Sequence, residues 1–340
     1  MRVLVTGATG FIGWHVAGKL IRQGAHVRAL VREGTDSSCV EKLGAEAARG
    51  DVRDIGPLRA AMKGCEMVYH LAADYRLWVR NPSSMYEVNV RGTVNVLQAA
   101  LDMKIEKVIY TSSVGALAAS RDGTPSDEDT PVTLDDMCGH YKKSKFLAER
   151  EAEKFHIEKG LPVVILNPAT PIGAMDRKPT PTGKIIVDFL NGRIPAYLDT
   201  GLNFVDVEDV AEAHLLAAER GRPGEKYIIG NRNMALREFF ESLSAETGLP
   251  APTVRLPYRP VLIAAYFSEA LSNWVTGKPP AIPLAGVRMA GKYMFFNCAK
   301  GLRELKTPQT PVQEAIRKAV RWFIENGYVG NGFILKKKTA

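Results

Sequence analysis

The sequence predicts an α/β fold in which a doubly wound parallel sheet carries a smaller C-terminal cap. Three observations lead to this prediction. Short apolar runs alternate with amphipathic stretches through the first half of the chain, a glycine-rich turn follows the first apolar run, and the alternation stops near Pro168. Strands that alternate with helices form parallel sheets with right-handed crossovers, so the first half should build the sheet.

Six apolar runs are predicted as strands, because near-continuous apolar runs are typical of strands that helices cover on both faces. They are Val3–Val5, Val27–Val31, Ala45–Ala48, Met67–Leu71, Val108–Thr111 and Val163–Leu166. Helices are predicted between them, over Ile12–Arg22, Asp54–Met62, Met85–Met103 and Tyr141–Lys159. The chain therefore begins as a series of strand–helix units.

The second half is predicted as a cap packed on this sheet. Its proline-rich stretch Met175–Gly183 is predicted as a loop, and Phe204–Gly221 as a short strand leading into a helix. Further helices are predicted over Leu236–Thr247, Val261–Val275, Leu284–Met289 and Pro311–Asn326. We expect a dinucleotide-binding domain over residues 1–170 and a tail over residues 331–340. Between them, residues 171–330 should form mostly a substrate-binding cap, with some segments returning to the sheet.

Composition excludes several classes of protein. The 340 residues include 45 Lys and Arg against 37 Asp and Glu, a net charge of +8, with 46% hydrophobic residues. These fractions are typical of globular proteins and exclude a disordered chain, a collagen or a coiled coil. The basic residues are spread along the chain apart from Lys336–Lys338, so we predict no nucleic-acid partner and instead a small-molecule substrate.

The four cysteines form no CxxC pair and have no neighbouring histidine cluster; they are Cys39, Cys65, Cys138 and Cys298. This pattern argues against a metal site and a disulfide framework, and it predicts a reducing, cytoplasmic location.

A membrane-spanning segment and a signal peptide are not predicted. The first residues, MRVLVTG, already have the pattern of a strand entering a turn. The longest apolar stretch, Pro260–Trp274, is shorter than the ~20 residues of a spanning helix and contains Glu269. It is better explained as a packed helix, with peripheral membrane contact as the alternative. A homodimer is left open.

Three glycines, Gly7, Gly10 and Gly13, lie in TGATGFIG directly after the first predicted strand and at the start of a helix. Such a turn lets backbone N–H groups approach a pyrophosphate, whose charge the helix N-terminus stabilises. The alternative is a tight turn without a ligand, but its position favours a Rossmann-like dinucleotide site. The predicted cofactor contacts in this turn are Gly7, Thr9, Gly10, Phe11, Ile12 and Gly13.

The end of the second strand indicates which dinucleotide fits. An acid at this position would bind the ribose 2′-hydroxyl of NAD, but the chain has Val31 and Arg32 here. A cation fits the 2′-phosphate, so we predict NADP(H) as the preferred cofactor, with NAD(H) allowed. The alternative is that Arg32 is only a solvated surface residue, and the neighbouring Glu33 favours this alternative.

Two further strand ends supply candidate cofactor contacts. Asp51, followed by Val52, comes after the third strand and could accept a hydrogen bond from the adenine amino group. Leu71, Ala72 and Ala73 end the fourth strand, where small residues would let the backbone approach a cofactor.

A serine pair and a YxxxK pattern are the candidate catalytic groups. Ser112 and Ser113 end the fifth strand, and Tyr141 and Lys145 stand four residues apart, on one face of a predicted helix. An ammonium beside a phenol should lower the tyrosine pKa from ~10, which makes the phenol a usable proton donor or acceptor. A lone YxxxK occurs by chance, and its alternative is a solvated helix face. Here the serine pair and the YxxxK pattern both follow the glycine turn, in that order, and the three motifs together favour a catalytic role.

With these motifs in this order, the chain resembles the extended short-chain dehydrogenase/reductase family, also described as NAD-dependent epimerases and dehydratases. The resemblance covers Met1–Asn167 and continues more loosely through Phe204–Ala211. It implies that Tyr141 is the acid/base, that Lys145 binds the nicotinamide ribose and tunes Tyr141, and that Ser113 orients the substrate oxygen.

The same resemblance implies further roles. Ser113 is preferred to Ser112 because the catalytic hydroxyl of the family usually stands third in a Ser/Thr triplet, here Thr111-Ser112-Ser113. Asn89 should support the site from the fourth helix, and the alternative role of a helix-start cap is compatible with this one. Pro168 should lie in a turn that lines the nicotinamide.

Two departures from the sugar-nucleotide enzymes favour the branch similar to dihydroflavonol 4-reductase and to hopanoid-associated sugar epimerases. These are Val31-Arg32 and the run SSVGALA in place of a VYG-type run. We therefore expect an NAD(P)(H)-dependent oxidoreductase that transfers a hydride to the carbonyl of a small organic substrate. The alternatives are a nucleotide-sugar epimerase or dehydratase with retained NAD, and a non-catalytic dinucleotide sensor.

The substrate is not identified by the sequence. In the loop after the fourth strand, Tyr75, Trp78 and Arg80 could line a pocket or anchor the surface, and Ser112 is a further candidate.

Overall fold

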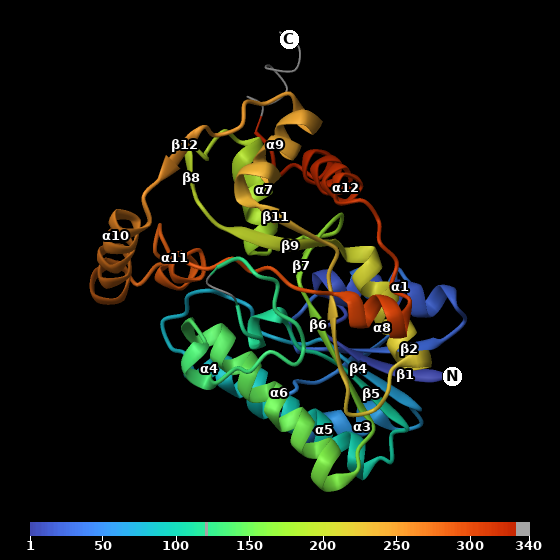
Figure 1. Ribbon diagram of the computed structural model, residues 1–340. Helices are drawn as coiled ribbons and strands as arrows, with labels where there is room; N and C mark the ends of the chain where they lie inside the picture. The colour runs from blue at the N-terminus through green and yellow to red at the C-terminus, as the bar shows by residue number, and fades with distance from the viewer. Residues whose placement is uncertain (120–121, 331–340) are drawn as a thin grey trace.

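The computed structural model describes residues 1–119 and 122–330, so the predicted tail over residues 331–340 lies outside the described residues. A seven-stranded parallel sheet forms the centre of the molecule (Figure 1). From one edge to the other its strands are β3 (Glu46–Arg49), β2 (His26–Val31), β1 (Arg2–Thr6), β4 (Met67–His70), β5 (Lys107–Thr111), β6 (Val163–Pro168) and β10 (Lys226–Ile229). The predicted doubly wound, Rossmann-like α/β fold is confirmed.

The strand order reverses between β1 and β4. The chain builds outward from β1 to β3, then returns and builds from β4 in the other direction. Open α/β sheets bind their ligands at the carboxyl ends of the strands beside such a reversal. The glycine turn follows β1, so it lies at this point.

Helices cover both faces of the sheet. One face carries α1 (Phe11–Arg22) and α8 (Val207–Arg220), and the other carries α3 (Ile55–Met62), α5 (Gly92–Asp102) and α6 (Gly139–Lys159) (Figure 1). Successive side chains of a strand point to opposite faces. Val3 and Val5 accordingly pack with α1 and α8, while Leu4 packs with α3 and α5. Burial on both faces explains why the three central residues of β1, Val3–Val5, are all apolar.

The helix predicted over Met85–Met103 is divided in the structure. It consists of α4 (Ser83–Tyr86), one turn of π-helix (η1, Glu87–Arg91) and α5. Period-3.6 patterning does not distinguish a π turn from an α turn, because the run of helical residues is continuous. The π turn carries Asn89, and such turns are frequent at functional sites.

The second half of the chain builds a separate apolar core. It contains the three-stranded sheet β11 (Arg232–Ala235), β9 (Gly201–Asp206) and β7 (Thr170–Ile172), together with α7 (Pro181–Leu190), α9 (Leu236–Thr247) and α12 (Val312–Glu325). Phe204 of β9 stacks on Phe239 of α9 with ring centroids 4.3 Å apart. Short segments complete this half: β8 (Ala196–Leu198), β12 (Val254–Leu256), α10 (Tyr258–Leu271), η4 (Ser272–Thr276), α11 (Leu284–Met289) and η5 (Gly301–Leu305). The short elements α2 (Ser38–Glu41), η2 (Val114–Ala116) and η3 (Leu134–Asp136) lie in the first half.

The prediction of a loop over Met175–Gly183 is wrong at its end. Helix α7 begins at Pro181, and the Thr180 side chain accepts a hydrogen bond from the Gly183 amide as its cap. Proline suits the first position of a helix because its missing N–H needs no partner there. The prolines of this stretch therefore mark a helix start as well as a loop.

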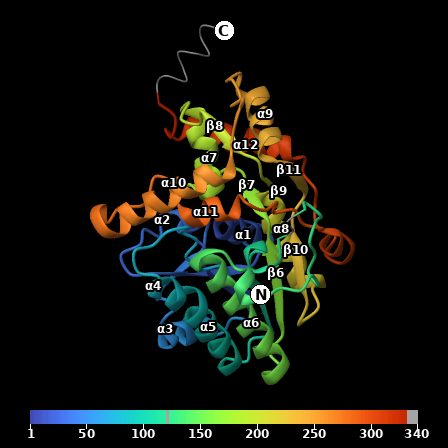
Figure 2. The same cartoon turned by 60° about the vertical axis from the view of Figure 1, so that its left-hand side comes forward.

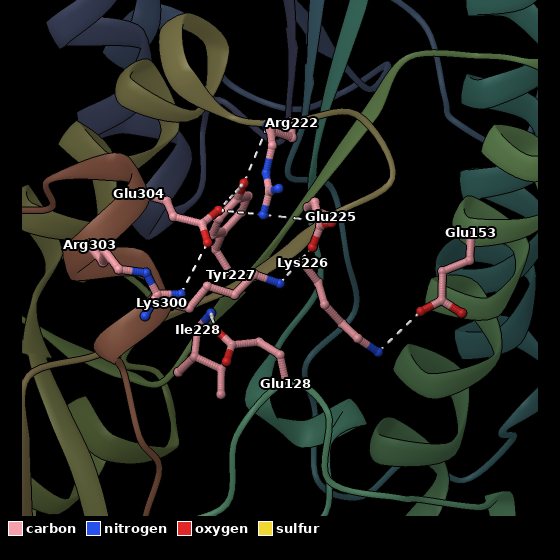
Figure 3. A network of polar contacts seen from close by, with 10 residues as sticks. All are labelled: Glu128, Glu153, Arg222, Glu225, Lys226, Tyr227, Ile228, Lys300, Arg303 and Glu304. Carbon is pink, nitrogen blue, oxygen red and sulfur yellow. Dashed lines mark hydrogen bonds and ion pairs between the residues drawn. The ribbon is translucent and has the colours of Figure 1, made fainter.

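The edge strand β10 returns from the second half to the sheet and is fixed by charged side chains (Figure 3). The Glu128 carboxylate accepts a hydrogen bond from the Ile228 amide at 2.7 Å. Lys226 reaches Glu153 of α6 at 3.2 Å. Charged groups on an edge strand discourage pairing with another sheet. The network also ties β10 to the helix that carries the YxxxK residues.

Candidate active site

Two of the three glycines in the first turn, Gly7 and Gly13, are required by close packing. A Cβ at Gly7 would lie 2.7 Å from the Ala72 amide nitrogen, and one at Gly13 would lie 2.1 Å from the Gly7 carbonyl oxygen. Gly7 also has a positive φ of 73°. Helix α1 starts at Phe11, and its cap residue Gly10 supplies no side-chain hydrogen bond to the first turn. The turn therefore presents backbone N–H groups and a helix N-terminus without bulky side chains, which fits a pyrophosphate.

A buried histidine holds the neighbouring strand end against this turn. His70 Nδ1 lies 2.8 Å from the Thr6 hydroxyl, and its Nε2 lies 3.0 Å from the Thr93 hydroxyl. Burial lowers the pKa of His70 to about 3, so the ring is neutral. The Thr6 hydroxyl also accepts from the amides of Leu71 and Ala72. The small residues predicted to approach a cofactor are thus packed against the glycine turn.

Three arginines line a hollow at the carboxyl ends of β2 and β3: Arg32, Arg49 and Arg53. Arg49 donates to the Thr35 carbonyl at 2.8 Å, so it holds the loop after β2 in place. Arg53 donates to Asp51 through its side chain at 2.8 Å. The Arg32 side chain is exposed, which agrees with the alternative that it is a solvated surface residue. It also lines the same hollow.

Asp51 is already engaged by a neighbour. The pKa of Asp51 is lowered, mainly by hydrogen bonds from Arg53. The positive charge of Arg32 lowers this pKa further, whereas partial burial opposes the change. Val52 packs on α5, where its Cγ2 would lie 2.7 Å from a Cβ on Gly92, and its carbonyl accepts from Asn95. The carboxylate predicted to contact adenine therefore also orients an arginine of the hollow.

The serine, tyrosine and lysine meet at the carboxyl end of β5. The side chains of Ser113 and Tyr141 lie next to each other at Gly115, where an added Cβ would meet Ser113 Oγ at 3.2 Å and Tyr141 Cε1 at 3.6 Å. The Ser113 oxygen also accepts from the Gly115 amide at 2.9 Å, which fixes its position. Lys145 is buried, and its ammonium donates to the Thr111 carbonyl at 2.8 Å and contacts the Tyr110 hydroxyl at 3.3 Å. The YxxxK pair is therefore no solvated helix face.

The prediction that the lysine lowers the pKa of the tyrosine is not what the structure shows. Burial raises the pKa of Tyr141, and the hydrogen bond from Ser113 opposes this rise. Burial also lowers the pKa of Lys145 to about 8, against the attraction of Glu149. The helix places both residues on one face, but the ammonium of Lys145 is directed to the end of β5. The four-residue spacing in the sequence predicts neither the direction of the ammonium nor the effect of burial on the two pKa values.

Ser112 points into the interior instead of the site. Its hydroxyl donates to the Glu149 carboxylate at 2.5 Å, and the same oxygen accepts from the Asn167 amide group at 2.7 Å. Asn167 also donates to the Ser113 carbonyl at 3.1 Å. Lys226 lies 3.5 Å from the other oxygen of Glu149, which is fully buried. This network fixes the backbone of Ser113.

Asn89 clamps two segments of the site together. Its side-chain amide donates to the Asp74 carbonyl at 2.8 Å and to the Ser144 hydroxyl at 2.9 Å, and its oxygen accepts from the Asp74 amide at 2.7 Å. Ser144 in turn donates to the Tyr141 carbonyl at 2.8 Å. Asn89 therefore connects the loop after β4 with the turn between Tyr141 and Lys145. Its alternative role as a helix-start cap is absent, because it lies inside the π turn.

The candidate substrate residues of the loop after β4 contact the second half of the chain. The Tyr75 hydroxyl donates to the Lys178 carbonyl at 3.2 Å, and the Trp78 indole donates to Asn273 at 3.2 Å. Arg80 lies beside Gly277. These contacts match the anchoring alternative, and they place the loop between the sheet and the C-terminal half. Pro168 ends β6 and is buried.

Sequence reasoning missed Glu149, Asn167 and His70 as parts of the site. Glu149 stands four residues after Lys145, so helical spacing could have placed it beneath the YxxxK face. His70 ends β4 and Asn167 is the residue before the last of β6, and a polar residue near the end of an apolar strand was the available signal. Within residues 1–119 and 122–330, no cluster of His, Cys, Asp or Glu could hold a metal ion. Within the same ranges, no helix has the length and apolar character needed to cross a membrane.

Comparison with known proteins gives consistent results. The family model described as "NAD dependent epimerase/dehydratase family" matches residues 3–230. A Synechocystis sp. protein named "Putative dihydroflavonol 4-reductase" is 41% identical over 96% of this chain and 95% of its own length. "Sterol demethylase protein B" of Methylococcus capsulatus is 31% identical over 97% of this chain and 100% of its own length.

Among solved structures, the one described as "Crystal structure of gox2253" has a TM-score of 0.87 and 45% sequence identity, covering 97% of this chain and 99% of its own. The likeness in fold therefore extends through both halves of the molecule.

Proposed function

The chain belongs to the NAD-dependent epimerase/dehydratase family and is an NAD(P)-dependent oxidoreductase of the short-chain dehydrogenase/reductase type, and we propose that it reduces the carbonyl of a small organic substrate with NADPH. The placement of the Ser113 and Tyr141 side chains next to each other, beside Gly115 at the carboxyl end of β5, carries this proposal. It places two hydroxyl groups together where the fold binds ligands. The name of the relative at 41% identity supports a reductase.

The proposed mechanism gives each residue one task. Bound nicotinamide would supply the hydride. The Tyr141 hydroxyl donates a proton to the carbonyl oxygen as negative charge develops there, because burial keeps this hydroxyl protonated at neutral pH. The Ser113 hydroxyl donates a hydrogen bond to the same oxygen and holds it in place.

Lys145 has one donor left for a ligand. An ammonium has three N–H donors, and two of them are directed to Thr111 and Tyr110. We propose that the third binds the nicotinamide ribose. Below pH 8 the ammonium is charged, which also favours negative charge on nearby oxygens.

We propose a preference for NADP(H) because arginines line the hollow at the carboxyl ends of β2 and β3. Arg32 faces the same hollow as Arg49 and Arg53, and it directly follows β2, which pairs with the strand that leads into the glycine turn. Two of the acids that line the hollow are engaged, since Asp51 binds Arg53 and Asp54 accepts from the Gly56 amide. Glu33 also lines the hollow, so its three acids balance its three arginines, and the proposal depends on Arg32, whose exposed guanidinium can donate to a 2′-phosphate.

Two other functions are alternatives to a reductase, and they belong to different classes of protein. A nucleotide-sugar epimerase or dehydratase would retain NAD and return the hydride to its substrate, and the family name includes such enzymes. A dinucleotide sensor would bind the nucleotide without turnover. The buried arrangement around Tyr141 and Lys145 speaks against a sensor, because it costs desolvation of an ammonium.

We further propose that residues 1–170 bind the dinucleotide and that residues 171–330 bind the substrate.

The four cysteines are free thiols, which supports a cytoplasmic location.

The deciding experiment follows the label of NADPH deuterated at its transferable position, in a screen of ketones and sugar nucleotides. A reductase consumes the nucleotide stoichiometrically and passes deuterium to the product. Turnover of a sugar nucleotide with no net nucleotide oxidation would instead establish the epimerase alternative. Nucleotide binding with no turnover of any substrate would favour the sensor.

A further inference from the structure

Helix α10 is apolar on two opposite faces. Its inner face packs Ala265 against Leu284 and Val287 of α11. Its outer face, which continues into η4, exposes large apolar side chains three or four residues apart. They are Ile263, Tyr266, Phe267, Leu271, Trp274 and Val275. Phe267 is 73% exposed and Trp274 is 87% exposed, so both rings are largely open to solvent, whereas Arg288 lies over the ring of Tyr266.

This exposure contrasts with α12, whose apolar side packs into the core of the second half while residues such as Arg317 and Arg321 face solvent. A helix that is apolar on all sides is normally buried. In Figure 2, α10 lies at the periphery, away from the central sheet. The outer face of α10 and η4 therefore has the character of a surface that a partner covers.

The charges around this face select the partner. Residues 254–292 contain five basic side chains and a single acid, Glu269. The Glu269 carboxylate accepts a hydrogen bond from the Leu284 amide, on the side of α11. Arg259, Lys278 and Arg288 are exposed. The surroundings of the apolar face are thus basic.

We propose that the outer face of α10 and η4 docks on an anionic lipid bilayer. Tryptophan, tyrosine and phenylalanine at the tip of a surface helix are suited to the boundary between headgroups and acyl chains. Basic residues around them are attracted to anionic headgroups. A second copy of the chain would bring like-charged surroundings together, which disfavours self-association through this face. The helix lies on the bilayer and does not cross it.

The proposed docking face borders the candidate site. Asn273 of η4 accepts from Trp78, and Gly286 of α11 lies beside Leu77. Both partners belong to the loop after β4, which also carries Asp74, the residue clamped by Asn89. Docking would therefore hold the loop after β4 near the membrane surface. The proposal does not depend on the reaction that the site performs.

Sedimentation of the full chain with vesicles tests this proposal. We expect the wild type to bind vesicles of phosphatidylcholine and phosphatidylglycerol in equal parts about tenfold more tightly than vesicles of phosphatidylcholine alone. The double variant Phe267→Ser, Trp274→Ser should bind at least about tenfold more weakly. The variant Arg259→Glu, Lys278→Glu should lose the preference for anionic vesicles.

Ile157→Ser is the matched control, because Ile157 is 78% exposed on α6, remote from this face in sequence. It should bind vesicles as the wild type does. Wild-type protein that stays in the supernatant with both vesicle types would overturn the proposal, as would equal binding by the double variant. A wild-type dimer that the double variant converts to a monomer, without vesicle binding, would assign the face to a second copy.

A second measurement removes the dependence on variants that could misfold. Brominated lipids should quench tryptophan emission of the wild type, and Trp274→Phe should remove most of that quenching. Equal quenching in the two proteins would place the contact elsewhere and overturn the assignment to this face.

Discussion

The carboxyl edge of the central sheet is built differently at its two ends. Around β5 and α6, the reacting groups rest on buried side chains, with Glu149 and Ser144 fully enclosed. Around β2 and β3, exposed arginines line a hollow and are oriented by short contacts with loop carbonyls and Asp51. The buried end restricts geometry, whereas the exposed end mainly supplies charge. Substitutions at the first end should therefore affect turnover and stability, and those at the second should affect affinity.

The largest effect is expected from Tyr141→Phe. Loss of the transferable proton should reduce turnover by up to ~10⁴-fold, while the affinity for the nucleotide stays nearly unchanged. Steady-state kinetics and a nucleotide titration measure the two quantities. Lys145→Ala is the comparison, since it should weaken both. Substantial turnover by Tyr141→Phe would show that another group donates the proton.

Glu149→Ala should produce the largest loss of stability. It leaves the buried Ser112 and Asn167 donors without their acceptor and removes one of the two carboxylates beside Lys226, and disrupting such a buried charged network typically costs ~3–5 kcal/mol. Chemical denaturation gives the free energy of unfolding. Glu149→Gln keeps an acceptor and should retain much of that stability. Equal stability of wild type and Glu149→Ala would contradict the buried network.

The two serines provide a sharper test of the same end. Ser113→Ala should raise the barrier to turnover by up to ~3–4 kcal/mol, because the substrate oxygen loses a donor. Ser112→Ala should cost ~1–3 kcal/mol of stability with little change in kcat, because its hydroxyl serves Glu149. If Ser112→Ala impairs turnover more than Ser113→Ala does, the assignment within the pair is wrong.

At the exposed end, Arg32→Ala should weaken NADP(H) binding by ~1.5–3 kcal/mol, about tenfold to a hundredfold, without weakening NAD(H) binding. Titration of both nucleotides measures the change. Arg317→Ala on α12 removes an exposed arginine elsewhere and should leave both affinities unchanged. Tighter binding of NAD(H) than of NADP(H) by the wild type would refute the proposed preference.

The smallest effect concerns pH. The pKa of Lys145 is about 8, so the ammonium is charged below this pH and loses its charge above it. Turnover in the direction of reduction should therefore fall as the pH rises through 8, while Tyr141, whose pKa is raised, stays protonated. The pKa of Lys142 is also about 8, so the profile should persist in Lys142→Gln. A profile that is flat from pH 7 to 9 would exclude this role for Lys145.

The sequence by itself determined the order of strands and helices in the first half and the positions of the glycine turn, the serine pair and the YxxxK residues. Local signals suffice there, because buried parallel strands have apolar centres and tight turns require glycine. The loop predicted over Met175–Gly183 was wrong at its end because proline is compatible with both a loop and a helix start. The π turn at Asn89 was missed because it interrupts a helix without changing its apolar pattern.

Only the tertiary structure decided how the site residues are oriented. Ser112 and Ser113 are adjacent and chemically equal in the sequence, yet one donates to Glu149 and the other meets Tyr141. The direction of the Lys145 ammonium toward β5 likewise depends on the Thr111 carbonyl, which comes from a different element. Orientation and pKa depend on burial and on partners distant in sequence. Both arise only when the helices close over the sheet.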